Sequence, residues 1–222
     1  MLFHPTGATH PLVETADFRG PLPDGVAAYG PALRAVFDWA GEYLVGPHPE
    51  LGRRGAVCPF TDTSLQRGLF WISVHPGVPH GPDELAELLL HYRDWFVDLA
   101  PTAGPAAQFK TILVLFPDLA DHTVVDRTQE LLKPDYTQQG LMIGEFHPGP
   151  PDKAGLWNPA FRPLRSPVPL LAVRHMVPTD FPFLRDDDAT VAAYLQRFGD
   201  RVPGHLRGDV SAAADRLATS GS

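Results

Sequence analysis

The chain has 222 residues, of which 44% are hydrophobic and 20% are charged, and this composition is typical of one compact folded domain. Its net charge of −8 and pI near 5.6 argue against a nucleic-acid partner, because phosphate binding depends on basic surface. No apolar run approaches the ~20 residues that cross a membrane, and the first residues lack the pattern of a signal peptide. The single cysteine, Cys58, permits no intrachain disulfide, which favours a reducing cytoplasm.

Hydrophobic periodicity and the positions of proline and glycine predict the order of the elements. Residues 1–25 are rich in both and predict an extended arm laid over the domain. Pro134 is expected to end the helix before it, since proline breaks a helix interior. After the arm, the predicted elements are a helix over 26–44, a strand over 68–74, a helix over 82–99, a strand over 111–116, a helix over 121–133, strands over 141–146 and 168–174, and helices over 189–198 and 210–218. The order predicts a single α/β domain (1–222) with a central apolar sheet, flanking helices, long Pro/Gly-rich loops and a frayed tail at 219–222.

The strand over 141–146 carries the most informative stretch, because it delivers His147 to a strand end and is stopped there by Pro148. A side chain at the carboxyl end of a buried strand lies where α/β proteins commonly bind ligands. The next strand ends in Arg174 and His175, and the loop between the two strands carries Arg162 and Arg165. We therefore expect the functional site between these two strand ends.

Common catalytic motifs are absent: the sequence has no Gly-rich nucleotide loop, no His-Glu-x-x-His, no Cys-x-x-Cys and no Gly-x-Ser-x-Gly. Cys58, in a loop beside Arg53 and Arg54, is either a small buried hydrophobe or a reactive thiolate. Asp180 is expected to pair with a neighbouring arginine, and the Asp186–Asp188 run is expected at a helix N-terminus, where the dipole favours carboxylates.

The residues near the two strand ends suit a planar cofactor. Haem needs an axial His or Cys ligand, an apolar slot, and arginines for its propionates. His147 would be the metal ligand, and the arginines Arg162, Arg165 and Arg174 would meet the carboxylates. The walls of the slot would be Phe146, Trp157 and Phe161.

Three features, in order, resemble the bacterial YqcI/YcgG-type haem proteins, which include haem-dependent N-oxygenases of arginine and related amino acids. They are the loop His48-Pro49…Val57-Cys58-Pro59-Phe60, the apolar strand Thr111 to Phe116, and the segment from Ile143 through His147 to Arg174. The family's cysteine motif has the order Phe-Pro-Cys, whereas this chain has Cys-Pro-Phe, so the resemblance is that of a sister family. It implies haem as the cofactor, His147 as its axial ligand, and dioxygen and an external electron donor as partners.

The resemblance implies a haem-dependent oxygenase that oxidises a small nitrogen-containing metabolite, such as an amino acid, guanidine or amine, in specialised metabolism. Catalytic roles would fall to Glu145 and His175, and Cys58 would line the pocket or replace His147 as axial ligand. Two alternatives stay open: a cofactor-free ligand-binding or interaction module, and an acid–base enzyme that uses His147 with Glu145 or Asp180. Exposed apolar loops also leave room for a homodimer.

Overall fold

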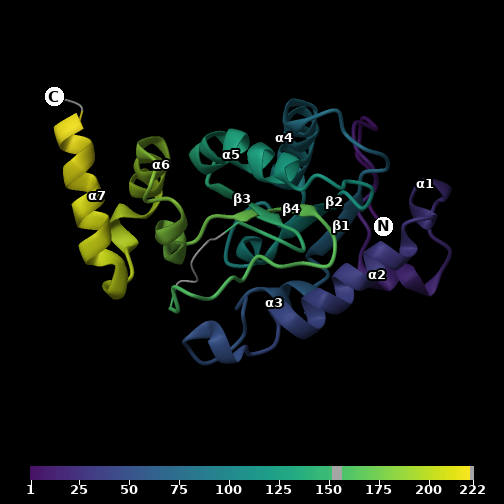
Figure 1. Ribbon diagram of the computed structural model, residues 1–222, viewed down its shortest axis with the longest axis horizontal. Coiled ribbons are helices and arrows are strands. Elements are labelled where there is room, and N and C mark those ends of the chain that lie inside the picture. Colours follow the sequence, from purple (N-terminus) through teal and green to yellow (C-terminus); the bar gives the residue numbers. More distant parts are fainter. Residues whose placement is uncertain (152–156, 221–222) are drawn as a thin grey trace.

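The computed structural model describes residues 1–151 and 157–220, and it is a single α/β domain built on one four-stranded sheet. Helices α4 (Pro82–Asp98) and α5 (Thr123–Gln138) cover one face of the sheet, and α2 (Gly30–Trp39) and α3 (Thr61–Gln66) cover the other (Figure 1). The expected central sheet between helices is thus confirmed.

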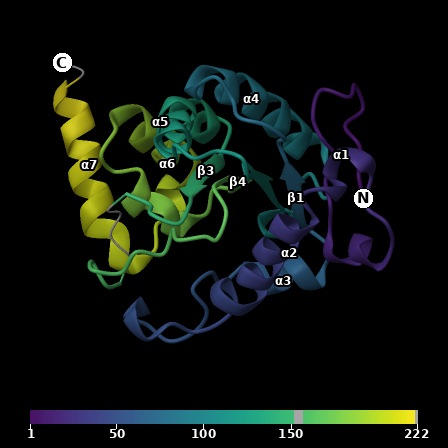
Figure 2. The ribbon, with the colours of Figure 1, turned by 45° about the vertical axis from the view of Figure 1, so that its right-hand side comes forward.

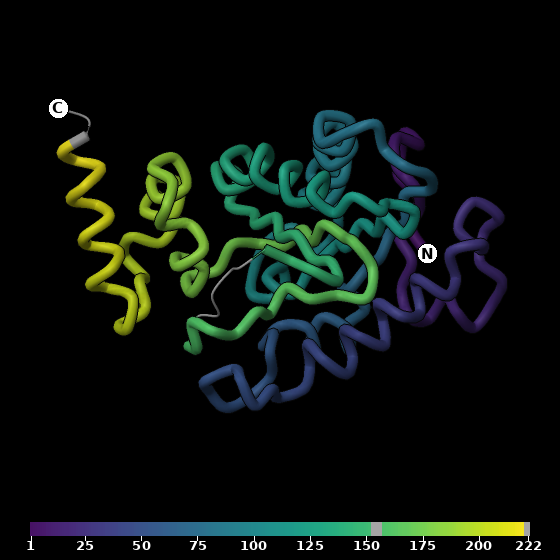
Figure 3. Tube along the Cα trace, viewed as in Figure 1, coloured from purple at the N-terminus to yellow at the C-terminus, as the bar shows by residue number. Residues whose placement is uncertain are grey.

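The sheet is mixed, and its order is β1 (Phe70–Val74), β2 (Thr111–Leu115), β4 (Leu170–His175), β3 (Leu141–Phe146). Strands β1 and β2 are parallel, as expected for strands joined by a crossover helix, while β4 is antiparallel to both of its neighbours. The last strand along the chain therefore lies inside the sheet, and the 23-residue connection over 147–169 precedes it. In Figure 3, residues 157–169 run along the sheet on the side of α2 and α3.

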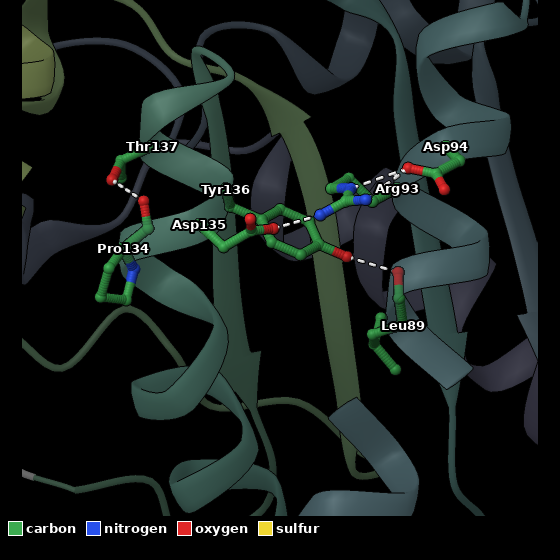
Figure 4. Close-up of polar contacts among 7 residues, drawn as sticks. All are labelled: Leu89, Arg93, Asp94, Pro134, Asp135, Tyr136 and Thr137. Atoms are coloured by element: carbon green, nitrogen blue, oxygen red, sulfur yellow. Dashed lines mark hydrogen bonds and ion pairs between the residues drawn. The ribbon is translucent and has the colours of Figure 1, made fainter. Parts of the chain in front are cut away.

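Helix α5 continues past Pro134 to Gln138, so the prediction that proline ends this helix at Lys133 is wrong. Contacts with α4 explain the extension, as Figure 4 shows. The buried Tyr136 hydroxyl donates to the carbonyl of Leu89 at 2.6 Å, and Asp135 forms an ion pair with Arg93. Tertiary contacts of the last turn outweigh the loss of one backbone donor.

The predicted helix over 26–44 is divided in the structure. A short helix α1 (Asp24–Ala27) precedes α2, and the chain then changes to a π-helical turn, η2 (Ala40–Leu44). The apolar stripe of α2 is nevertheless the expected one, with Leu33 and Val36 fully buried against the sheet. Hydrophobic periodicity thus predicted which face of the helix is buried, but not the breaks before and after α2.

The N-terminal arm pairs with the outer edge of β1. Val13 and Ile72 form an antiparallel bridge, with N–O distances of 2.8 Å in both directions, and the Ser73 hydroxyl donates to the carbonyl of His10. The arm also contains the 3-10 helix η1 (Thr15–Arg19). It covers a sheet edge that would otherwise expose unpaired backbone groups.

The C-terminal elements pack in an apolar cluster that also includes Met142 of β3. These elements are η5 (Pro178–Phe183), α6 (Asp188–Phe198), η7 (Gly204–Leu206) and α7 (Arg207–Ser220). Asp187 caps α6 by accepting from the backbone of Thr190 at 2.8 Å, which confirms the expected place of this acidic run. In Figure 2, as in Figure 1, α7 lies at the opposite end of the molecule from the N-terminal arm. Residues 221–222 of the expected tail lie outside the described residues. In the described part of the chain, no helix combines the length and apolarity that crossing a membrane requires.

Candidate functional site

The sheet face toward α2 and α3 is hollowed above β3 and β4. The strand register sets Leu113, Ala172 and Gly144 side by side on this face. Ala172 is only partly buried although β4 is an inner strand, and Gly144 on β3 is likewise only partly buried. On the opposite face, the neighbouring Leu171 and Val173 are fully buried under α4 and α5. Two small residues side by side thus leave space above the sheet.

This space is a cavity of about 790 Å³, which we call the inner cavity. Its volume is within the range of about 300–1,000 Å³ that holds small molecules and cofactors. Helix α3 and the preceding loop, η2, the C-terminal elements and the sheet all contribute to the wall. The aromatic members of that wall are Trp39, Phe60, Phe70, Phe109, Phe146, Trp157 and Phe183.

Arg174 and Cys58 both border the inner cavity. The Arg174 guanidinium binds Asp180 through two hydrogen bonds, of 2.8 and 2.7 Å, and donates a third to the carbonyl of His175. Burial lowers the pKa of Arg174, but the Asp180 carboxylate and, more weakly, the Cys58 sulfur raise it above its ordinary value. Three of the five guanidinium donors are thus used, and the expected pairing of Asp180 with an arginine is confirmed.

Ser64 and Lys110 are among the other polar residues that border this cavity. Ser64, on α3, is 2% exposed, and its buried hydroxyl has no hydrogen-bond partner among the described residues. Lys110 is 1% exposed, and its ammonium group donates to the carbonyls of Phe96 and Leu99 at 2.7 Å each, which caps the end of α4. Burial lowers the pKa of Lys110 to about 8. Lys110 therefore already has a structural role, whereas the buried Ser64 hydroxyl has no partner among the described residues.

His147 lies at the end of β3, as expected, but it lines neither this cavity nor the groove described below. Its side chain is 2% exposed, and both ring nitrogens are occupied. The backbone N–H of Gly149 donates to Nδ1 at 3.3 Å, so Nε2 carries the proton and donates to Asp126 at 3.1 Å. The ring of His122 packs against that of His147, with centroids 4.8 Å apart. Asp126, rather than Glu145 or Asp180, is thus the carboxylate partner of His147.

The two expected catalytic residues are apart. Glu145 lies on the edge strand β3, is 2% exposed, and borders the inner cavity beside Gln129 of α5. His175 points to the opposite face, where its ring packs on Phe96 with a centroid distance of 5.0 Å. Burial, with Lys110 and Arg197 nearby, lowers the pKa of His175 to about 4. His175 therefore lines neither hollow.

A second hollow, of about 800 Å³, lies between the outer side of α2 and residues 160–167, and we call it the outer groove. Three expected cofactor contacts, Phe161, Arg162 and Arg165, line this groove rather than the inner cavity. Phe161 packs against His48, with ring centroids 4.9 Å apart. The expected cofactor site is thus divided between the two hollows. The inner cavity is lined by Cys58, Phe146, Trp157 and Arg174, and the outer groove is lined by Phe161, Arg162 and Arg165.

Sequence reasoning missed Trp39, Ser64 and the pair Gly144 and Ala172. A signal existed for Gly144, because a glycine inside an apolar strand often marks close approach of another group. Trp39 lies within the predicted helix over 26–44, and Ser64 lies in a stretch for which no element was predicted. Nothing in the local pattern of either residue distinguishes a cavity wall from ordinary core.

In the parts of the chain that the structure describes, no three His, Cys, Asp or Glu side chains are grouped to hold a metal ion. A haem iron takes one or two protein ligands, so this finding does not bear on haem. A family model described as a domain of unknown function (DUF6875) matches residues 33–209, from the first turns of α2 to the start of α7. No curated protein matches the chain, and no solved structure does.

Proposed function

This chain belongs to the DUF6875 family, whose function is unknown, and from its inner cavity we propose that it is a haem-dependent oxygenase of a small nitrogen-containing metabolite. The observation that carries the proposal is the inner cavity itself, which joins a thiol, aromatic walls and a guanidinium around about 790 Å³. The single cysteine suits a reducing cytoplasm as the site of this activity.

The axial ligand in this proposal is Cys58. Cys58 borders the cavity, whereas the His147 imidazole has both nitrogens engaged, with Gly149 and with Asp126. The thiolate is the form of cysteine that binds metals, and Cys58 shares the cavity with the Arg174 guanidinium. We thus assign the metal-binding role to Cys58 in place of His147.

Other residues of the cavity would position the group and its substrate. Trp39 and Phe146 present apolar surface to a macrocycle, and two Arg174 donors remain for a propionate. The Ser64 hydroxyl would hydrogen-bond a polar substrate. Thiolate-ligated haem, when bound, supplies oxygen activation that favours O–O cleavage, with dioxygen and an external electron donor as co-reactants.

A second candidate function is cofactor-free binding of a small ligand in the same cavity. The observation that favours it is that Arg174 and His147 already have carboxylate partners, Asp180 and Asp126 respectively. Each of the two side chains thus has a carboxylate partner without a cofactor. An apolar ligand with one polar end, directed at Ser64, would then suffice.

The test is an absorbance spectrum of protein produced with added haem, beside Cys58→Ala and His147→Ala. We expect a Soret band in the wild type and in His147→Ala, and its loss or shift in Cys58→Ala. A band that survives in Cys58→Ala but is lost in His147→Ala would return the axial role to His147.

No band in any preparation would reject haem and leave the second candidate. That candidate has its own measurement, the fluorescence of the apolar dye 1-anilinonaphthalene-8-sulfonate on titration with protein. Binding in the wild type that is lost in Ala172→Phe, which fills the hollow, would support it. Equal binding by both proteins would reject the inner cavity as the dye site.

A further inference from the structure

The inner cavity and the outer groove share a thin wall. Residues 159–167 contribute Pro159 and Leu164 to the cavity but Phe161 and Arg165 to the groove. At the end of β3, Phe146 borders the cavity, while residue 148 borders the groove. Neighbouring residues on the same segments therefore face the two hollows.

Trp39 borders both hollows. Its ring meets Phe146 of the inner cavity edge-on, with centroids 5.8 Å apart and an angle of 72°. Its other neighbour is Tyr43 of the groove, stacked at 6.0 Å and 22°. The indole thus stands in the wall between the two spaces.

The backbone changes directly after Trp39 from α-helix to the π-helical turn η2, in which the N–H of Val45 donates to the carbonyl of Ala40 at 3.2 Å. Such turns occur frequently at functional sites. Ala35, one turn before Trp39, also lines the groove, so one stripe of α2 faces this hollow.

We propose that the outer groove is the entrance to the inner cavity and that Trp39 is the residue that separates them. The inference rests on the proposed function only in taking the inner cavity as the ligand site. The rings of Tyr43, His48 and Phe161 follow one another along the groove at 5.9 and 4.9 Å between centroids. A planar organic molecule would stack on these rings before it passes the indole.

The competing route is the side of the inner cavity next to Trp157, which is 47% exposed and packs on His205 at 5.0 Å. The two routes predict different effects of substitution on access to Cys58. Since Cys58 is the one thiol of the chain and borders the inner cavity, its alkylation reports entry without any haem or substrate.

The experiment compares the rates at which haem-free protein reacts with iodoacetamide and with the bulky N-(1-pyrenyl)maleimide. Dividing the second rate by the first cancels changes in thiol reactivity. We expect Trp39→Ala to raise this ratio by about tenfold, and Ala35→Trp, which narrows the groove, to lower it by about threefold. Trp157→Ala is the matched control and should leave the ratio within about twofold.

A ratio that rises in Trp157→Ala and is unchanged in Ala35→Trp would overturn the proposal in favour of the other route. An equal rise in both tryptophan variants would also overturn it, since that indicates general loosening. Circular dichroism checks the fold of each variant, and if Trp39→Ala does not fold, the Ala35→Trp result decides. The outcome does not depend on whether the protein binds haem.

Discussion

Arg174 holds Asp180 by two parallel hydrogen bonds, and the same guanidinium faces the inner cavity from the central strand β4. Asp180 also accepts from the backbone N–H of Val177 at 2.8 Å. The pair thus connects the sheet to η5 and fixes the cationic end of the cavity. A guanidinium oriented by a buried carboxylate is restrained before any ligand arrives.

Removal of this carboxylate should destabilise the fold. We expect Asp180→Ala to lower the free energy of unfolding by about 3 kcal/mol, because it leaves a largely buried guanidinium without its partner. The double variant Arg174→Met, Asp180→Leu should lose clearly less free energy of unfolding, because it removes both charges. Urea denaturation measures both, and equal losses in the two variants would contradict the assigned role of the unpaired charge.

Enlargement of Ala172 tests the hollow above the sheet. Ala172→Leu should change the free energy of unfolding by less than about 1.5 kcal/mol, because the added carbons enter the inner cavity. The same substitution at Ala40, which is fully buried against the sheet, should cost more. If thermal unfolding shows the same loss for both variants, the space above Ala172 is packed.

Acid should weaken the fold through His175. In the unfolded chain a histidine titrates near 6.5, and burial lowers the pKa of His175 to about 4. Between these values the unfolded chain binds the proton and the folded chain does not. Stability is therefore full above about pH 6.5 and falls as the pH drops toward 4, by roughly 2 kcal/mol once solvent screening is allowed for.

His175→Phe should remove the loss of stability at low pH that His175 causes. Urea denaturation at pH 7 and pH 4.5 gives the difference for each protein. Burial also lowers the pKa of His10 and His75, so the variant should keep a smaller dependence on pH. An unchanged dependence would show that His175 titrates normally.

A side chain at Gly140 should destabilise the fold. Its φ is +73°, and a Cβ atom would lie 1.8 Å from Nη2 of Arg197. Gly140→Ala is expected to cost more than about 1 kcal/mol, through backbone strain and displacement of the guanidinium. Gly149→Ala, where nothing lies within 4 Å, should be close to neutral.

Adding Arg197→Ala to Gly140→Ala separates the two contributions. The double variant should regain the stability that the clash with Arg197 removed, and it should keep the loss that comes from backbone strain at positive φ. A double variant that is no more stable than Gly140→Ala alone would place the whole cost in the backbone.

Apolar periodicity was sufficient to predict the sheet and the main helices, because each buries one regular face. The stripe of α2 and the strand over 141–146 show this directly. The extension of α5 past Pro134 was beyond such reasoning, since Tyr136 and Asp135 are held by α4, which is more than 30 residues away in sequence. Pro134 does not end α5 because contacts with a distant helix stabilise the last turn, and the local sequence does not reveal those contacts.

The candidate site was predicted in part. The prediction that the ends of β3 and β4 lie together is wrong, because the two strands are antiparallel and His175 pairs with Leu141 at the start of β3. The direction of each side chain also depends on strand register. Arg174 and His175 are adjacent in sequence, yet they point to opposite faces of the sheet. The partner of His147 could not be found either, because Asp126 approaches from α5, 21 residues earlier.

The position of β4 between β2 and β3 has a consequence for biosynthesis. During translation, β3 leaves the ribosome with no strand beside which it can bind, because its neighbour in the sheet is encoded 23 residues later. The parallel pair β1 and β2 can form early, but the floor of the inner cavity is assembled only when β4 inserts. The vectorial order of synthesis therefore makes the ligand site one of the last parts of the domain to mature.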